Sequence, residues 1–487
     1  MRTTLCTLAI AVALGSCGSG SDEPPTAPPP CPGPSFDGSP LSIRCGALVD
    51  ERGREVRLHG INARVEGVFD VALDGGRTPL EAIPPFGAAD ATRIRELGFS
   101  ALRLPIQWSG VEPAETGGFD EGYLARVRAA VDTAHAAGLY VLVDFHQDAY
   151  SKEIGEDGAP YWAIVPPPPQ KLEGPLDDLD QRRLSKPVLD AFETFFGPSP
   201  EGARLRDRFG KMVAHVAAAF ADHPGVIGFE LFNEPLASSA QLRSFHAALL
   251  PIVQAAAPKK LVLFEPPAIR NFTDRADIPD APLGPGTVYA PHVYTAAFGS
   301  AEVRAAVTED KLRRSYEAAR EESAAWQAPL VVTEIGFPPS DPRFAEYMGW
   351  HAALSDELGA STFFWVWKET SQGSWGVFDY DASGTATERA GVVAALSRVR
   401  IEACAGRVET IARERERVRV TFFGSEATNE HRLSLGTLLA AERATCDGAP
   451  ASIAPLPSNA ITVACGGAGR HVLDLYFGAA SVRGATQ

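Results

Sequence analysis

The chain has 487 residues, 45% of them hydrophobic, and a formal net charge of −16 at pH 7. This length and apolar content suffice for one large hydrophobic core with a smaller domain beside it, and they exclude a fibrous or disordered protein. The acidic balance excludes nucleic acid as a partner and electrostatic docking on anionic lipid, because both need clustered Lys and Arg.

Residues 1–17 have the pattern of an export signal. A short basic start is followed by an apolar stretch from Leu5 to Leu14, and then by small residues and Cys17. The stretch is too short to cross a bilayer, which needs about 20 apolar residues. Residues 14–17, Leu-Gly-Ser-Cys, are similar to the bacterial lipobox, in which the cysteine is acylated. We expect an exported bacterial protein, anchored to the cell envelope through a lipid on Cys17; the alternative is an ordinary secretory signal and a secreted protein.

Residues 18–40 are mainly Gly, Ser, Pro and short polar residues, which predicts an extended tether. From residue 41 to residue 400, apolar runs typical of buried parallel strands alternate with amphipathic helical segments. Eight runs are of the strand kind: 56–63, 99–106, 139–145, 226–232, 261–265, 287–294, 330–335 and 361–367. The helical segments include 123–137, 205–221, 241–256, 311–326 and 344–358. This alternation predicts an α/β fold, a (β/α)8 TIM barrel.

The largest insertion in the expected barrel runs from His146 to about Gly202, after the third strand. It contains Tyr-Trp-Ala-Ile-Val at 161–165 and four prolines at 166–169. Such a stiff, apolar loop either receives an apolar part of a substrate or packs on the barrel as a lid.

Residues 401–487 change to short alternating runs, which predicts a small β-sandwich domain. Five cysteines follow the signal: Cys31, Cys45, Cys404, Cys446 and Cys465. In an oxidising compartment they indicate one or two disulfides and one remaining thiol, and Cys446 with Cys465 is the preferred pair. Zinc binding is the weaker interpretation, because no CxxC or paired His lies nearby.

Two of the strand-like runs deliver a glutamate to the strand end. Glu234 stands in Phe-Asn-Glu-Pro at 232–235, and Glu334 in Thr-Glu-Ile-Gly at 333–336. A barrel brings such residues to one catalytic face, and two facing carboxylates cleave glycosidic bonds. A single glutamate of this kind is usually a salt-bridged loop anchor. Two, each in the right unit of the barrel, favour catalysis.

These two motifs resemble those of the clan A, family five glycoside hydrolases. The resemblance implies a retaining mechanism through a covalent glycosyl-enzyme, with Glu234 as acid/base and Glu334 as nucleophile. Glu234 would then need a raised pKa in the free enzyme.

Six further positions match the family pattern one by one, although each taken alone could equally be a core residue. Arg103 on the second strand would keep the nucleophile ionised, and Asn233 would bind the sugar 2-hydroxyl. His292-Val293-Tyr294 matches the family's His-x-Tyr, whose tyrosine contacts the nucleophile. His146 ends the third strand, and Trp367 would be the platform under the cleaved sugar.

A sharper resemblance, to the endoglycoceramidase group, is carried by Asp-Phe-His-Gln-Asp-Ala-Tyr-Ser at 144–151 and Gly-Ala-Pro-Tyr-Trp-Ala at 158–163. It implies that Asp148 and Trp162 contact sugar. The chain also departs from that group: residues 62–84 lack its glycan-binding lysine, for which Arg64 or Arg77 would substitute, and residues 295–299 lack its amide side chain.

The resemblance implies cleavage between the glycan and the ceramide of glycosphingolipids. The alternatives are an endo-β-glucanase, a β-mannanase or another glycolipid β-glucosidase and, in another class, a surface lipoprotein that binds glycans without cutting them. The ten histidines show no HxH or HExxH spacing, so His146 and His292 are not expected to bind a metal, and no cofactor is expected. A monomer is expected.

Overall fold

The computed structural model describes residues 33–69, 80–172, 174, 179–279, 281–370, 375–414, 416–437 and 439–479. Cys17, nearly all of the proposed tether and Arg77 lie outside these ranges. None of the helices within them combines the length and the apolar content that crossing a bilayer requires.

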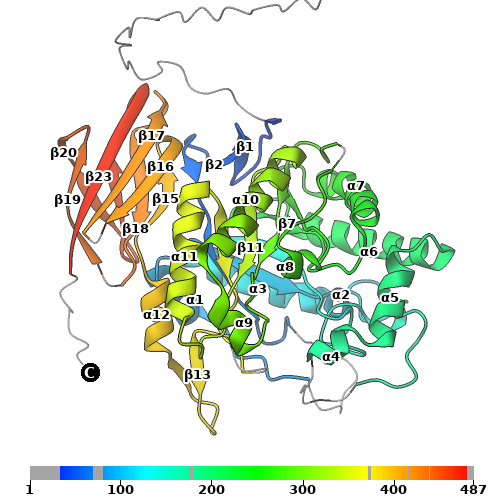
Figure 1. The fold of residues 1–487 in the computed structure, drawn as a ribbon. Helices are drawn as coiled ribbons and strands as arrows, with labels where there is room; N and C mark the ends of the chain where they lie inside the picture. The colour runs from blue at the N-terminus through cyan, green and yellow to red at the C-terminus, as the bar shows by residue number, and fades with distance from the viewer. Residues whose placement is uncertain are drawn as a thin grey trace, which may run out of the picture.

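A closed barrel of parallel strands forms the larger part of the molecule (Figure 1). Its strands are β4 (His59–Asn62), β5 (Ala101–Ile106), β6 (Tyr140–Phe145), β7 (Val226–Glu230), β8 (Leu261–Phe264), β9 (Thr287–Tyr289), β10 (His292–Val293), β11 (Val331–Ile335) and β12 (Ser361–Phe364). The segments β9 and β10 are halves of one strand: β9 pairs with β8, and β10 pairs with β11. Since β12 pairs with β4, the sheet closes, which confirms the predicted TIM barrel and its eight strand runs.

Burial explains why the strand runs are apolar almost throughout. Every residue of β5, β7, β8, β11 and β12 is buried, since helices cover the outer face and side chains fill the barrel. The covering helices include α1 (Ala88–Glu96), α3 (Glu121–Ala136), α6 (Pro200–Ala219), α7 (Ser239–Ala256), α10 (Glu309–Trp326) and α11 (Phe344–Leu358). Shorter helices are α2 (Trp108–Val111), α8 (Arg270–Thr273), α9 (Ala301–Ala306) and α12 (Ala390–Leu396).

The insertion after β6 packs on the barrel. It contains a 3-10 turn at Tyr161–Ala163 and the helices α4 (Leu179–Arg183) and α5 (Lys186–Phe196). Phe195 of α5 contacts the rings of Phe209, Phe232 and Phe245 from the barrel layer. Ala163 and Ile164 are buried, so the apolar run is mostly a packed lid, although Tyr161 is 41% exposed.

Two antiparallel sheets lie beside the barrel, in orange and red in Figure 1. The first has the order β1-β2-β3-β15-β18-β22-β21 and the second the order β16-β17-β23-β19-β20. Their strands are β15 (Arg400–Cys404), β16 (Gly406–Glu414), β17 (Arg417–Gly424), β18 (Glu430–Ser434), β19 (Leu439–Cys446), β20 (Ala449–Ala451), β21 (Ile453–Leu456), β22 (Ala460–Ala464) and β23 (Gly469–Ala479). A hairpin of β13 (Phe378–Tyr380) and β14 (Ala386–Glu388) precedes them. The extra antiparallel sheets agree with the predicted second domain, while its boundary at residue 400 stays a prediction.

The start of the described chain contributes to both parts. Strands β1 (Ser42–Arg44), β2 (Ala47–Val49) and β3 (Glu55–Val56) extend the first C-terminal sheet through the pairing of β3 with β15. Their side chains Leu41, Ile43 and Leu48 pack with residues inside the barrel, such as Leu142 and Phe363. This segment therefore closes the end of the barrel that lies opposite the strand C-termini.

The cysteines follow the expected pattern. Cys446 and Cys465 form the predicted disulfide, which excludes the zinc interpretation for that pair. Cys45 is also disulfide-bonded, and Cys404 is a buried thiol.

Candidate active site

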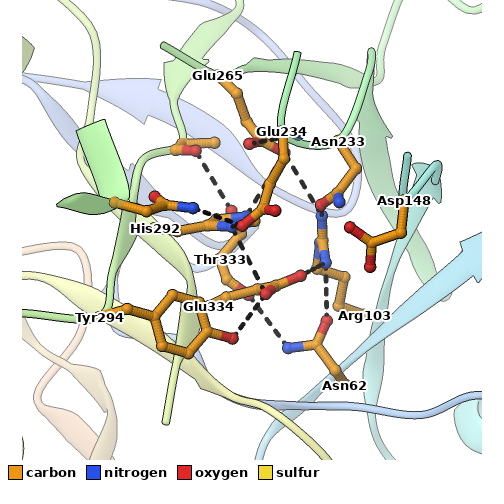
Figure 2. Close-up of polar contacts among 12 residues, drawn as sticks. Asn62, Arg103, Asp148, Asn233, Glu234, Glu265, His292, Tyr294, Thr333 and Glu334 are labelled. Carbon is orange, nitrogen blue, oxygen red and sulfur yellow. Dashed lines mark hydrogen bonds and ion pairs between the residues drawn. The ribbon is translucent and has the colours of Figure 1, made fainter. Parts of the chain in front are cut away.

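Glu234 and Glu334 face each other at the C-terminal ends of β7 and β11 (Figure 2). One carboxylate oxygen of Glu234 lies within 4.8 Å of one of Glu334. Retaining glycosidases hold their two carboxyl groups about 5–5.5 Å apart, whereas inverting enzymes need about 6.5–9.5 Å to admit a water. The spacing here fits the retaining geometry.

Glu334 is held by donors from two other strands. The guanidinium Nη1 of Arg103 donates to Oε1 at 2.6 Å, and the Tyr294 hydroxyl donates to Oε2 at 2.7 Å. His292 Nδ1 lies 3.5 Å from Oε2. The sequence predicted the contacts of Arg103 and Tyr294 with this carboxylate, and both are present.

Arg103 is fully buried and lies in a ring of acceptors. Its Nε donates to Glu230 at 2.5 Å, and its other nitrogens lie 3.0 Å from Asp144 Oδ2, 3.0 Å from Asn62 Oδ1 and 2.8 Å from Asn233 Oδ1. Although burial opposes the charge, these carboxylates raise the pKa of Arg103 well above its usual value. The guanidinium therefore stays charged, and its remaining donors fix the direction of the group that meets Glu334.

Sequence reasoning did not single out Glu230, Asp144 or Asn62. Each is a buried polar side chain in a barrel strand: Asp144 lies within β6, and Glu230 and Asn62 end β7 and β4. A lone polar residue at a buried strand position needs a polar partner, so its presence in an apolar run could have marked these residues as part of a polar site.

Glu234 has four polar neighbours from separate parts of the chain. Its Oε1 accepts from Asn271 Nδ2 at 2.5 Å and from His292 Nδ1 at 2.9 Å. Its backbone N–H donates to Glu265 Oε2 at 3.0 Å, and Arg183 Nη1 lies 3.5 Å from Oε2. Asn271, Glu265 and Arg183 belong to no motif that the sequence indicated, because loops bring them to the site.

The charges around the glutamates separate their pKa values. Burial raises the pKa of Glu234, but the hydrogen bond from His292 and the charge of Arg183 outweigh it and hold the pKa at about 2. Burial raises the pKa of Glu334, although His292 and Arg103 oppose this shift. Burial lowers the pKa of His292, but Glu334 and Glu234 raise it overall. The expected raised pKa of Glu234 in the free enzyme is therefore wrong: the pKa of this carboxyl is lowered, while the pKa of His292, whose Nδ1 lies 2.9 Å from it, is raised.

A second polar group lies beside the glutamates. His146 Nδ1 is 2.6 Å from Asp144 Oδ2, and His146 Nε2 is 3.8 Å from Asp148 Oδ2. Asp148 Oδ1 accepts from Arg183 Nη2 at 2.6 Å, so Arg183 bridges Asp148 and Glu234. Asn233 is held by Arg103 and by the backbone carbonyl of Gln147.

A family model described as cellulase (glycosyl hydrolase family 5) matches residues 49–371. The chain belongs to glycosyl hydrolase family 5. Endoglycoceramidase I of Rhodococcus hoagii (strain 103S) is 32% identical over 267 residues, which are 51% of this chain and 51% of that protein. This protein thus aligns with about half the length of that curated relative.

Solved structures extend the likeness. Endo-glycoceramidase II from Rhodococcus sp., as a cellobiose-like imidazole complex, is 26% identical with a TM-score of 0.70, over 88% of this chain and 99% of that chain. Its lactosyl-enzyme intermediate is 25% identical with a TM-score of 0.69, over the same shares of 88% and 99%.

Two predicted sugar contacts of this family 5 chain need revision. Trp367 is 1% exposed, and its Nε1 donates to Asp90 at 2.9 Å. Such burial leaves no free face for a sugar and contradicts the platform role predicted for Trp367. Trp365 follows β12 directly, is half-buried, and stacks on His146 with ring centroids 5.5 Å apart and an interplanar angle of 9°. Trp365 is therefore the strand-end tryptophan that borders the family 5 site.

Trp162 lies away from this group. Its Nε1 donates to the Glu112 carbonyl at 3.1 Å, and its ring packs edge-on against Trp108. Its sugar contact stays a prediction. Arg64 is buried and lies 2.5 Å from Glu81 and 3.4 Å from Glu369, so it is already neutralised where the related group has its lysine.

Three groups of residues in or beside the family 5 site have ligand atoms within 4.8 Å of one another, as metal sites do: His146, Asp148 and Asp157; Glu230, Glu265 and His292; Glu234, His292 and Glu334. Arg103 already provides a cation to several of these carboxylates. In the first group, Arg183 pairs with Asp148 at 2.6 Å. A metal ion would compete with one of these two guanidinium groups in each case, so the residues fit a metal poorly.

An exposed apolar patch adjoins the family 5 site. It consists of Ile269, Phe272, Phe298 and Val303, and Phe272 is 67% exposed. The Phe298 ring lies 4.6 Å from the ring of Tyr294, which contacts Glu334. Contiguous exposed apolar side chains of this kind mark interaction surfaces. Local sequence patterns did not reveal the patch, because its members come from separate loops and short helices.

Proposed function

We propose that this family 5 protein is a retaining β-glycosidase of the endoglycoceramidase type, which cleaves the bond between the glycan and the ceramide of glycosphingolipids. The separation of Glu234 and Glu334 supports the reaction, since it leaves room for one sugar and no intervening water. The likeness to endoglycoceramidase I and to endo-glycoceramidase II supports the substrate class.

In the first step, the carboxylate of Glu334 attacks the anomeric carbon while the bond to the leaving oxygen breaks. Arg103 and Tyr294 keep Glu334 oriented for this attack, and the charge of Arg103 favours its ionised form. His292 passes a proton to Glu234 through their 2.9 Å hydrogen bond, and the leaving oxygen takes this proton from Glu234, which is left as a carboxylate. The product of this step is a glycosyl-enzyme on Glu334.

In the second step, Glu234 accepts a proton from a water that attacks the same carbon from the opposite face. The bond to Glu334 breaks, and the sugar leaves with its original anomeric configuration. Asn233, fixed by Arg103, would bind the 2-hydroxyl, and the half-buried ring of Trp365 would support the sugar.

The apolar patch supports a lipid leaving group. Phe298 lies beside Tyr294, so a leaving group that exits past this tyrosine meets Phe272 and Ile269. Burying acyl or sphingoid carbons there would yield about 25 cal/mol per Å² of apolar surface. A plain glucan would find no comparable apolar partner on this side.

One assay tests the proposal. The protein is incubated with a ganglioside, glucosylceramide and cellohexaose, and the products are separated by thin-layer chromatography and mass spectrometry. We expect free ceramide together with an intact glycan. Release of sugar from cellohexaose alone would instead identify a β-glucanase, and absence of labelling by a 2-deoxy-2-fluoro glycoside would identify a binding protein.

We also propose that the chain is exported and lipid-anchored through Cys17. The support is the similarity of residues 14–17 to a lipobox. Metabolic labelling with a fatty acid, compared between the native chain and Cys17→Ala in a bacterial host, tests the anchor. Equal labelling of the two would exclude it.

A further inference from the structure

A small cavity lies between α11, α12 and the barrel strands β4 and β12. The helices α11 and α12 lie on the side of the barrel next to the C-terminal sheets (Figure 1). Its volume is about 30 Å³, and its lining includes His59, His351, Thr362, Arg398 and Arg400. About 10–15 Å³ of such volume holds one water, so the cavity accommodates about two waters or one monatomic ion in their place. A sugar does not fit.

Positive charge exceeds negative charge around this cavity. The guanidinium of Arg413 bonds Asp356 Oδ2, while Arg398 Nη1 lies 3.8 Å from the same oxygen, beyond hydrogen-bond distance. Within the described ranges the Arg398 guanidinium has no closer partner. The nearby carboxylate of Glu402 is already paired with Arg95 at 2.6 Å and Arg432 at 2.8 Å.

Arg400 uses its donors on the backbone. Its guanidinium donates to the carbonyl oxygens of Leu97 at 2.9 Å and Leu396 at 2.5 Å, and it lies over the Phe99 ring. These contacts satisfy hydrogen bonds but bring no negative charge. The single carboxylate of Asp356 thus interacts electrostatically with three guanidinium groups, those of Arg398, Arg400 and Arg413.

His351 adds an unsatisfied donor to the cavity wall. Its Nδ1 lies 2.8 Å from the Tyr316 hydroxyl, and its buried Nε2 has no hydrogen-bond partner among the described residues. The Tyr316 hydroxyl has no other acceptor in the described part of the chain, so it donates to Nδ1 and the ring proton lies on Nε2. A buried N–H without an acceptor is costly, and it requires an acceptor inside the cavity.

We propose that this cavity binds a small inorganic anion of halide size, held between the Arg398 guanidinium and the Nε2–H of His351. The anion would supply the negative charge that Asp356 alone does not provide. It would also accept a hydrogen bond from the Nε2–H of His351. Burial and nearby Arg413 lower the pKa of Arg398 to about 10, although Asp356 raises it, and a bound anion would favour the charged guanidinium. The inference does not depend on the proposed hydrolase activity.

Thermal unfolding in different sodium salts gives the first test. A ligand that binds only the folded state raises the unfolding midpoint in proportion to the logarithm of its concentration above Kd. We expect the midpoint of the full chain to rise by about 2 °C per tenfold increase in chloride, with sodium gluconate keeping the ionic strength constant. Equal midpoints in chloride and gluconate would count against an anion that enters from solution.

Two variants locate the effect. Arg398→Gln should lose the chloride dependence, because it removes the charged partner. Arg304→Gln is the matched control: the Arg304 side chain is 22% exposed, against 19% for Arg398, and it is paired with Asp341 at 2.8 Å. The control should keep the full dependence. A chloride dependence that survives in Arg398→Gln would overturn the assignment.

Crystals of the unaltered protein grown in sodium bromide keep the proposal testable if the variant does not fold. We expect an anomalous bromide peak within hydrogen-bond reach of His351 Nε2 and Arg398. Density for water alone in the cavity, or bromide bound only elsewhere, would overturn the proposal.

Discussion

Arg103 determines how the proposed nucleophile is presented. It meets Glu334 through one nitrogen, while Glu230, Asp144 and Asn233 take its other donors. A guanidinium suits this place because its planar set of donors is rigid and always charged. The carboxylate of Glu334 is thereby oriented by a cation of the protein itself.

The two glutamates should respond differently to substitution. We expect Glu334→Gln to lose activity by about 1,000-fold or more on every substrate, because no nucleophile remains. Glu234→Ala should retain turnover of aryl glycosides with good leaving groups, and added azide should increase it, because the vacated space admits an external nucleophile. Steady-state kinetics on a dinitrophenyl glycoside and on a glycolipid check both. Full activity in both variants would refute the assignment.

Arg183 should set the pH dependence of the acid step. It lies 3.5 Å from Glu234 and, after His292, is the group that most lowers the pKa of Glu234. The other charged groups that face Glu234 are His292, His146, Glu334 and Glu265. The acid step needs a proton on the hydrogen-bonded pair of His292 and Glu234, and removing a nearby cation makes that proton harder to lose, so the basic limb of kcat/KM moves to higher pH.

We therefore expect Arg183→Ala to shift this limb upward by up to about one pH unit on a glycolipid, and Arg183→Lys to shift it less. The matched control is Lys186→Ala in the same insertion, whose ammonium pairs with Asp190 and is exposed. On a dinitrophenyl glycoside, which needs no acid, the limb should not move. An unchanged profile in Arg183→Ala would show that Arg183 has no influence on Glu234.

At the scale of elements, short helices and loops rather than barrel strands shape the surroundings of the glutamates. The helix α8 places Asn271 on Glu234 and exposes Phe272 on the adjoining surface. One short helix thus serves both the proposed acid and the proposed lipid surface. Barrel enzymes vary their substrates through such loops while the strands keep the reaction.

The apolar patch should matter only for lipid substrates. We expect Phe272→Ser combined with Ile269→Ser to lower kcat/KM on a ganglioside by about tenfold, equivalent to about 1.4 kcal/mol of lost apolar contact. The same variant should hydrolyse a water-soluble aryl glycoside normally. Ile252→Ser, on an exposed position of α7, is the control and should change neither. Equal losses on both substrates would indicate a damaged site rather than a lipid surface.

At the scale of the whole molecule, the barrel and the C-terminal sheets share the first strands of the described chain. Leu41, Ile43, Leu48 and Val56 are buried against barrel residues, while β3 pairs with β15. Burying one such side chain contributes about 1.5–3 kcal/mol as an upper estimate. Loss of this segment is therefore expected to destabilise both the barrel and the C-terminal sheets.

A chain that begins at residue 18, which keeps Cys31 and the first strands, should therefore unfold like the full protein. One that begins at residue 57 should lose several kcal/mol of unfolding free energy or fail to stay soluble, because it exposes the lower barrel core. Guanidinium denaturation followed by circular dichroism distinguishes the two. Equal midpoints would mean that the segment is dispensable.

The sequence alone determined the barrel and its proposed catalytic pair. Strands buried on both faces must be apolar throughout, and their carboxyl ends meet at one edge, so the runs ending near Glu234 and Glu334 sufficed. Arg103, His292 and Tyr294 were predicted only through the resemblance to the family 5 motifs, and they lie on or directly after other barrel strands.

Only the tertiary structure showed where the residues outside regular strands and helices lie, because no repeating sequence pattern predicts their positions. Beyond Phe364 the eighth strand ends, so spacing could not tell that Trp365 borders the site while Trp367 is buried. Arg183 and Asn271 reach Glu234 from segments between the barrel strands, and the hydrogen bond from His292 together with the charge of Arg183 lowers the pKa of Glu234 instead of raising it. Local patterns record which residues are buried, but the electrostatics of a site depends on which distant segments meet there.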